Sequence, residues 1–267
     1  MFSSKKFIIL SIVMLMILVP MNTWATFSIY PYALDFDANS NKRIVSIRVA
    51  NTTNEPKTFR ISLVDQRQKS DGSFEQVPAD GTVLNSAKSF MTYSPRQFEL
   101  GPREAQTVNV SRKPVGDLPD GDYVTHLKIQ EVATPKPRES KKKTEKGMDV
   151  SIKLHYSLIV PVYLKKGEST GTVDIIAVKL TENAKKEQFA EVKMTKKGEK
   201  YFRGRLEIMN NGNLVGMVKN IRIYPDVSER IASVQLMKDT PNLSGKDVKV
   251  LYIDDADNVI AKNSFKP

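Results

Sequence analysis

The chain has 267 residues, of which 40% are hydrophobic and 27% charged, and it contains no cysteine. This composition permits one large or two ordinary packed domains, and it excludes disulfides, thiol catalysis and zinc–thiolate sites. The formal net charge of +11 is compatible with nucleic acid, an anionic membrane surface or an acidic protein as partner, and it does not choose among them.

The N-terminus has the pattern of a secretory signal peptide. Lys5 and Lys6 precede an apolar run over residues 7–19, and Ala25 is a small residue at a plausible cleavage point. Because the run is short for a membrane span, a cleaved signal is favoured over an uncleaved anchor. We therefore exclude residues 1–25 from the fold. Loss of the two lysines lowers the formal charge from +11 to +9.

The next residues read as strands separated by turns. Residues 43–51 alternate apolar and polar side chains and end at Asn-Thr-Thr-Asn, a turn signal. Pro95 indicates that the segment 90–100 is an edge or irregular strand. The strands expected in this half are 26–36, 43–51, 58–64, 90–100, 105–111, 123–132 and 148–164. With no convincing helical period, the pattern predicts an antiparallel sandwich of about seven strands.

The segment 148–164 is the one around which the chain is organised. Its first part alternates, with apolar residues at every second position from Val150. From Leu158 to Leu164 it becomes continuously apolar, as expected for a strand that enters a packed region. The segment follows a basic stretch, 134–146, that reads as a solvated connection. Either the strand belongs to an ordinary sandwich, or it lends its apolar row to another protein.

A polar segment, 165–171, indicates a hinge and a domain boundary. We expect one domain over 26–166 and a second β-sandwich over 167–267. Asn210 to Asn213 is a clear hairpin or turn signal. The strands expected in the second domain are 173–180, 189–194, 201–209, 217–224, 231–237, 248–253 and a short piece near Val259.

Catalytic chemistry has little support in the sequence. His126 and His155 lie in separate strands, where a lone histidine is usually structural. The sequence contains no G-x-S-x-G, no phosphate-binding P-loop and no H-E-x-x-H motif. The acidic segment 254–258 lacks the spacing of a calcium loop and reads as an exposed turn. Asp35 and Asp37 share one face of a strand without forming a poised acid and base. We predict no enzyme activity, no cofactor and no metal.

The first domain resembles periplasmic pilus-assembly chaperones of the PapD type, especially their archaic or alternate branch. The resemblance covers most of residues 28–165 and is weak over 170–267. The pieces that carry it occur in the family's order: Phe36-Asp37-Ala38, RIVSIRVANTTNEP, SPRQFELGPREAQTVNVS, LPDGDYVTHLKIQEV and VSIKLHYSLIVPVYL. It implies two immunoglobulin-like β-sandwich domains in an L-shaped arrangement.

The resemblance also implies a binding mode, in which the chaperone completes an unfinished pilin sandwich with a strand of its own. The donated row would be Met148, Val150, Ile152 and Leu154. The family anchors the subunit's C-terminal carboxylate between two basic residues, of which Lys153 matches one. This chain has Tyr32 or Ala33 where the family usually has an arginine in the first strand, and Arg96 is the substitute we assign.

Function and partners follow from the same resemblance. We expect a periplasmic chaperone for pilus or fimbrial subunits that delivers them to an outer-membrane usher, with no nucleic acid and no small-molecule substrate. A nucleic-acid binder is disfavoured because the basic run lacks interleaved aromatic residues. The main alternative is an exported two-domain adhesion or surface-assembly protein without chaperone activity.

Overall fold

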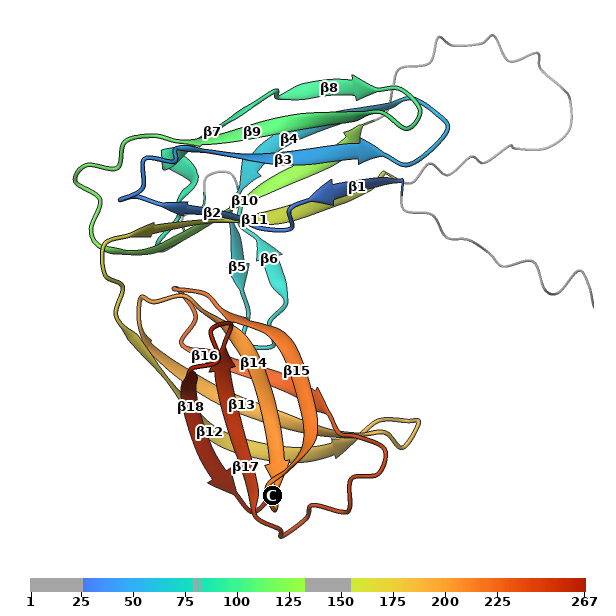
Figure 1. Cartoon of the computed structure of the whole chain (residues 1–267), viewed down its shortest axis with the longest axis vertical. Helices are drawn as coiled ribbons and strands as arrows, with labels where there is room; N and C mark the ends of the chain where they lie inside the picture. The colour runs from blue at the N-terminus through green and yellow to red at the C-terminus, as the bar shows by residue number, and fades with distance from the viewer. Residues whose placement is uncertain (1–25, 79–80, 82, 133–154) are drawn as a thin grey trace, which may run out of the picture.

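The structure, a computed structural model, describes residues 26–78, 81, 83–132 and 155–267. Within these ranges every regular element is a strand except one short 3-10 helix, η1 (Lys88–Phe90). The strands build two β-sandwiches whose long directions cross, which gives the molecule an L shape (Figure 1). The predicted fold class is thereby confirmed. No helix in the described ranges is long and apolar enough to cross a membrane.

The first sandwich has two sheets. One has the strand order β1-β3-β9-β7 and the other β2-β11-β10-β4-β8. The bounds of their strands are β1 (Phe27–Tyr30), β2 (Leu34–Asp37), β3 (Ile44–Asn51), β4 (Lys57–Val64), β7 (Met91–Ser94), β8 (Gln97–Leu100), β9 (Ala105–Arg112), β10 (Gly121–Val132) and β11 (Ser157–Lys166). Its core forms where alternate residues of both sheets meet, among them Ile47, Val49, Phe59, Leu127 and Ile129. Burial of each such side chain contributes roughly 1.5–3 kcal/mol.

Two segments that the sequence presented as single strands are each divided by a proline. Pro31 separates β1 from β2, and Pro95 separates β7 from β8; both follow cis peptide bonds. In each case the chain passes from one sheet to the other at the proline. Because proline cannot donate to a strand ladder, it is a natural point for this change. The irregularity at Pro95 was expected, and the one at Pro31 was not.

A two-stranded hairpin, β5 (Gln66–Gln68) and β6 (Phe74–Gln76), was not predicted. It leaves the first sandwich and reaches the second (Figure 1). Its turn contains Asp71, which accepts a hydrogen bond from the Ser73 amide at 2.8 Å, and Gly72, whose φ of 87° favours glycine. The hairpin therefore joins the two bodies at a point far from the chain connection.

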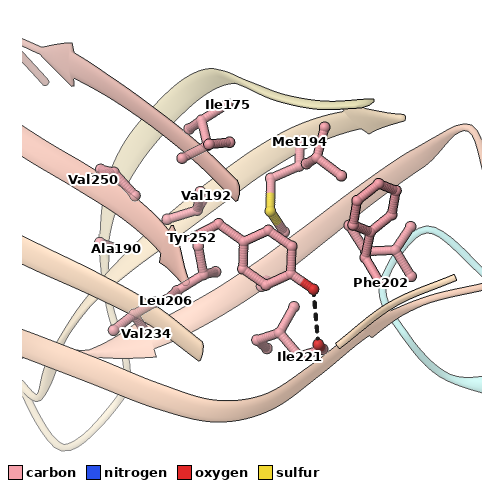
Figure 2. Close-up of a cluster of buried hydrophobic side chains, with 14 of the residues drawn as sticks. Ile175, Ala190, Val192, Met194, Phe202, Leu206, Ile221, Val234, Val250 and Tyr252 are labelled. Carbon is pink, nitrogen blue, oxygen red and sulfur yellow. Dashed lines mark hydrogen bonds between the residues drawn. The ribbon is translucent and has the colours of Figure 1, made fainter. Parts of the chain in front are cut away.

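The second sandwich contains sheets of order β12-β13-β16 and β15-β14-β17-β18. Its strands are β12 (Gly171–Glu182), β13 (Gln188–Gly198), β14 (Phe202–Asn210), β15 (Asn213–Ile223), β16 (Glu229–Gln235), β17 (Val248–Asp254) and β18 (Val259–Phe265). Figure 2 shows its core, where the buried Tyr252 hydroxyl donates to the Ile221 carbonyl at 3.0 Å. The predicted hairpin signal is confirmed: Asn211 and Gly212 both have positive φ between β14 and β15.

Gly204 lies at an irregularity in β14 where the backbone of β17 comes very close. A Cβ at this position would lie 2.0 Å from the Ile253 carbonyl oxygen. We expect Gly204→Ala to lower the free energy of unfolding by about 1–3 kcal/mol, because backbone must move to admit the methyl group. Urea titration followed by circular dichroism measures the change.

The matched control is Gly116→Ala, because a Cβ at Gly116 has no atom within 4 Å. That variant should stay within about 0.5 kcal/mol of the parent protein. Equal stabilities of the two variants would contradict the packing around Gly204.

Candidate functional site

Strand β11 packs on both of its faces. Val160, Val162 and Leu164 point into the core of the first sandwich. Tyr163, on the opposite face, belongs to the hydrophobic cluster of the second sandwich. Successive side chains of a strand point to opposite sides, so a strand that serves two cores must be apolar at every position. This accounts for the buried part of the continuous apolar run, residues 160–164.

The first half of β11 has an open outer side. Strand β10 pairs with β11 from Ser157 to Lys166, but β2 pairs with it only from Val162 to Lys165. In the described part of the chain, residues 157–161 therefore have no ladder partner on that side. Leu158 is 37% exposed, and Tyr156 just before the strand is 49% exposed. Unpaired backbone groups beside exposed apolar side chains form a template for another strand.

Aromatic rings from both bodies meet at the joint between the sandwiches. We call this group the aromatic cluster: Phe74, His126, Tyr163, Tyr201 and Tyr224. The Tyr163 and Tyr201 rings are 4.5 Å apart, and the Tyr201 hydroxyl donates to the Tyr163 hydroxyl at 3.0 Å. His126 stacks on Tyr224 at 5.8 Å, and Phe74 lies 5.2 Å from Tyr224. Such pairs add roughly 0.5–1.5 kcal/mol each beyond the area they bury.

The hairpin reinforces this joint with polar contacts. The buried Gln68 side chain accepts from the Tyr224 amide at 3.0 Å and donates to the Arg222 carbonyl at 3.1 Å. At the hairpin turn, the Ser70 carbonyl accepts from the Ile231 amide at 2.7 Å. Gln68 thus satisfies two backbone groups at the end of β15, as a neighbouring strand would.

A cleft of about 430 Å³ lies beside the joint and is lined from both bodies. Asp122 fixes the positions of two other residues that line the cleft. Its Oδ2 accepts hydrogen bonds from the Tyr201 amide at 2.8 Å and from the Ser169 hydroxyl at 2.9 Å. Burial, and then the nearby Tyr163, raise the pKa of Tyr201 far above its ordinary value, so its hydroxyl remains a donor. The other charged side chains that line the cleft are Asp35, Asp37, Lys165 and Lys200.

Most residues of the predicted binding site lie outside the described residues. These are Met148, Val150, Ile152, Lys153 and Leu154. Arg96 is described: it is exposed between β7 and β8, with its guanidinium carbon 5.9 Å from the centre of the Tyr93 ring. It is not among the residues that line the cleft. The donated row and the anchor pair therefore remain predictions.

The two histidines have different surroundings. His126 is buried in the aromatic cluster, whereas His155 is exposed just before β11. The segment 254–258 is the turn between β17 and β18, where Asp254 Oδ1 accepts from the amides of Ala256 and Asn258. The described residues contain no group of three or more His, Asp or Glu side chains that could hold a metal ion.

Sequence reasoning missed the hairpin and with it Gln68 and Phe74. The segment Gln66-Arg67-Gln68 has no apolar alternation, and its contacts lie in the other sandwich. Tyr201 and Tyr224 were placed in or beside strands without a role at the joint. The available signal was the turn at Asp71-Gly72, followed closely by Phe74, an aromatic residue of the kind enriched in strands.

Comparison with known proteins yields fold similarity alone. No family model matches the chain, and no curated protein matches it. A structure described as a chaperone–tip adhesin complex of CFA/I fimbriae biogenesis matches with a TM-score of 0.48 and 14% identity, covering 90% of this chain and 98% of the other.

Two further neighbours are single chaperones. The YadV chaperone gives a TM-score of 0.47 at 12% identity, covering 91% of this chain and 100% of its own. The CupB2 chaperone of Pseudomonas aeruginosa gives a TM-score of 0.46 at 14% identity, covering 89% of this chain and 97% of its own. These low identities and scores leave the function of this chain to be inferred from its own residues.

Gln68 gives a test of the joint. In Gln68→Leu, the Tyr224 amide and Arg222 carbonyl lose their partners while water stays excluded, which should cost about 1–3 kcal/mol for each group. In differential scanning calorimetry we expect one coupled unfolding transition for the parent protein and two separate transitions, one for each sandwich, for Gln68→Leu.

The control for this variant is Gln76→Leu, an exposed glutamine on the partner strand of the same hairpin. It should leave the calorimetric profile unchanged. A Gln68→Leu profile identical to that of the control would show that the hairpin does not couple the two bodies.

Proposed function

We propose that this chain is a periplasmic chaperone that binds pilus or fimbrial subunits by lending them a β-strand. The observation that carries the proposal is the open outer side of β11 over residues 157–161, with Leu158 exposed beside it. This edge directly follows, in the chain, the alternating apolar row from Met148 to Leu154. The edge and the row together supply what strand donation needs: free main-chain groups and side chains at every second position.

The physical reasoning concerns a guest whose sandwich lacks one strand. Such a guest exposes its apolar core and an unpaired edge, and both promote aggregation. A donated strand pairs with the edge and fills the groove with alternate side chains. Four side chains of the donated row would contribute roughly 1.5–3 kcal/mol each, before the cost of ordering the strand. Folding of the guest then provides the driving force, without nucleotide or catalysis.

The carboxylate anchor is a separate part of the proposal. Lys153 would bind the C-terminal carboxylate of the subunit, with Arg96 as the second cation. A carboxylate held by two cations gains charge-assisted hydrogen bonds, which fix the register of the guest strand more than they add affinity. Release of the guest would occur by transfer to an outer-membrane usher, after export of the chaperone by its signal peptide.

Site-specific crosslinking at Leu158 tests the edge. We expect p-benzoyl-phenylalanine at this position, introduced in the native host, to crosslink in the periplasm to one small β-rich protein. Mass spectrometry should place the crosslinked peptide in an edge strand of that protein, because a guest strand beside residues 157–161 comes within contact distance.

The control position is Val259, which is 52% exposed on β18 of the second sandwich. It should give no such product. Equal crosslinking at both positions, or none at Leu158, would count against strand donation and favour the adhesion or surface-assembly alternative.

Variants of the donated row test the binding mode. Ile152→Asp should abolish retention of the crosslinked partner in a pull-down, because a carboxylate cannot enter an apolar groove without a large desolvation cost. Ser151→Asp, on the opposite side of the alternation, is the matched control and should retain the partner. Circular dichroism establishes that both variants fold. Loss of the partner in neither variant, or equally in both, would refute an alternating donated row.

Lys153→Ala and Arg96→Ala test the anchor independently of the row. If each residue holds the carboxylate, each variant should weaken retention of the partner about tenfold or more while Leu158 crosslinking persists. Full retention in Arg96→Ala would remove Arg96 from the site and leave strand donation intact.

A further inference from the structure

His126 is a buried titratable group that the proposed binding mode does not use. Its side chain projects from β10, is 3% exposed and lies between the two bodies. Its ring stacks on Tyr224 of the second sandwich and meets the edge of Phe74 from the hairpin at 5.9 Å. His126 therefore contacts both elements that close the joint.

The hydrogen bonding around this ring suits its neutral form. Nε2 lies 3.1 Å from the Tyr224 hydroxyl, to which it can donate when the neutral ring carries its proton on Nε2. Nδ1 is buried without a well-formed hydrogen bond. A charged imidazolium is a donor at both nitrogens, so protonation would leave one charged N–H poorly satisfied in a buried place.

The groups facing the ring from the neighbouring elements act in opposite directions. Asp65 at the end of β4 and the Val64 backbone favour the charged ring, whereas Arg222 on β15 disfavours it. Asp65 is already bonded to the Thr125 and Ser86 hydroxyls, at 2.8 and 2.9 Å. Burial exceeds all of these influences and lowers the pKa of His126 to about 4.

We propose that His126 is a pH-sensitive latch whose protonation opens the joint between the two sandwiches. The proposal goes beyond the chaperone function and is independent of it. Opening lets the ring reach water, while the closed joint keeps it neutral. Because the cleft of about 430 Å³ is lined from both bodies, its shape follows the state of the latch.

The direction of the pH effect follows from linkage. The closed joint lowers the pKa of the His126 imidazole, which is a base. The stability that the neutral ring contributes to the closed joint is therefore complete above the ordinary histidine pKa of about 6.5. It is lost as the pH falls from there toward the closed-state value of about 4. Across this pH window the equilibrium constant for opening of the joint should rise by about two orders of magnitude. The reason is that each unit of difference in the His126 pKa between the open and closed states changes this constant up to about tenfold.

Two measurements on the intact chain test the latch. Nuclear magnetic resonance titration reports His126 directly, because the chain has only two histidines and His155→Gln assigns the other. Spin labels on Glu99→Cys and Lys249→Cys, one exposed site in each body, report the distance between the sandwiches by electron paramagnetic resonance. The absence of native cysteines makes this labelling specific.

We expect His126 to titrate below pH 5, and a second, broader distance population to grow between pH 6.5 and 4.5. His126→Phe keeps an aromatic ring but cannot be protonated, and it should hold the parent protein's neutral-pH distance throughout. His126→Gln serves the same purpose if the phenylalanine variant is open at pH 7.5.

Three results would each overturn the latch. The first is a His126 pKa of 6 or higher. The second is a distance distribution that does not change down to pH 4.5. The third is the same acid opening in a variant without the histidine, which would assign the effect to carboxylates instead.

Discussion

Both sandwiches depend on the packing of β11 on its two faces. Val162 is fully buried in the first core, and its neighbour Tyr163 packs against Tyr201 on the other side. A strand used in this way cannot shift in register without exchanging the residues of the two faces. The position of the open edge at residues 157–161 is therefore fixed by the same packing that joins the two bodies.

One covalent connection between domains ordinarily permits motion about a hinge, and the segment 167–170 between β11 and β12 is short and polar. The hairpin adds a second attachment at the end of β15, through Gln68 and Phe74. Two attachments at separate places restrict the angle between the bodies. A cleft held in this way is formed before any partner arrives, which reduces the ordering cost of binding there.

The sequence was sufficient where structure follows local pattern. Alternating apolar residues located β3 and β13, and the Asn211-Gly212 pair located the hairpin between β14 and β15. It was insufficient where stability comes from distant contacts. Gln68 bonds to the backbone of Arg222, 154 positions away, and nothing in the residues near Gln68 indicates that partner. The donated row was predicted from alternation and resemblance, and its residues are not described by the structure.

The residues of β11 limit the part of its outer edge at which a guest strand can pair. β10 pairs along the whole of β11, including Pro161 opposite His126. A proline is tolerated in a paired strand when its missing N–H belongs to the outward side, so the outer edge lacks a donor at Pro161. Beyond it β2 occupies the edge from Val162 onward. A guest strand therefore finds few free donors near the joint. It must extend its pairing toward the start of β11, which is the direction of Leu154 and the alternating row.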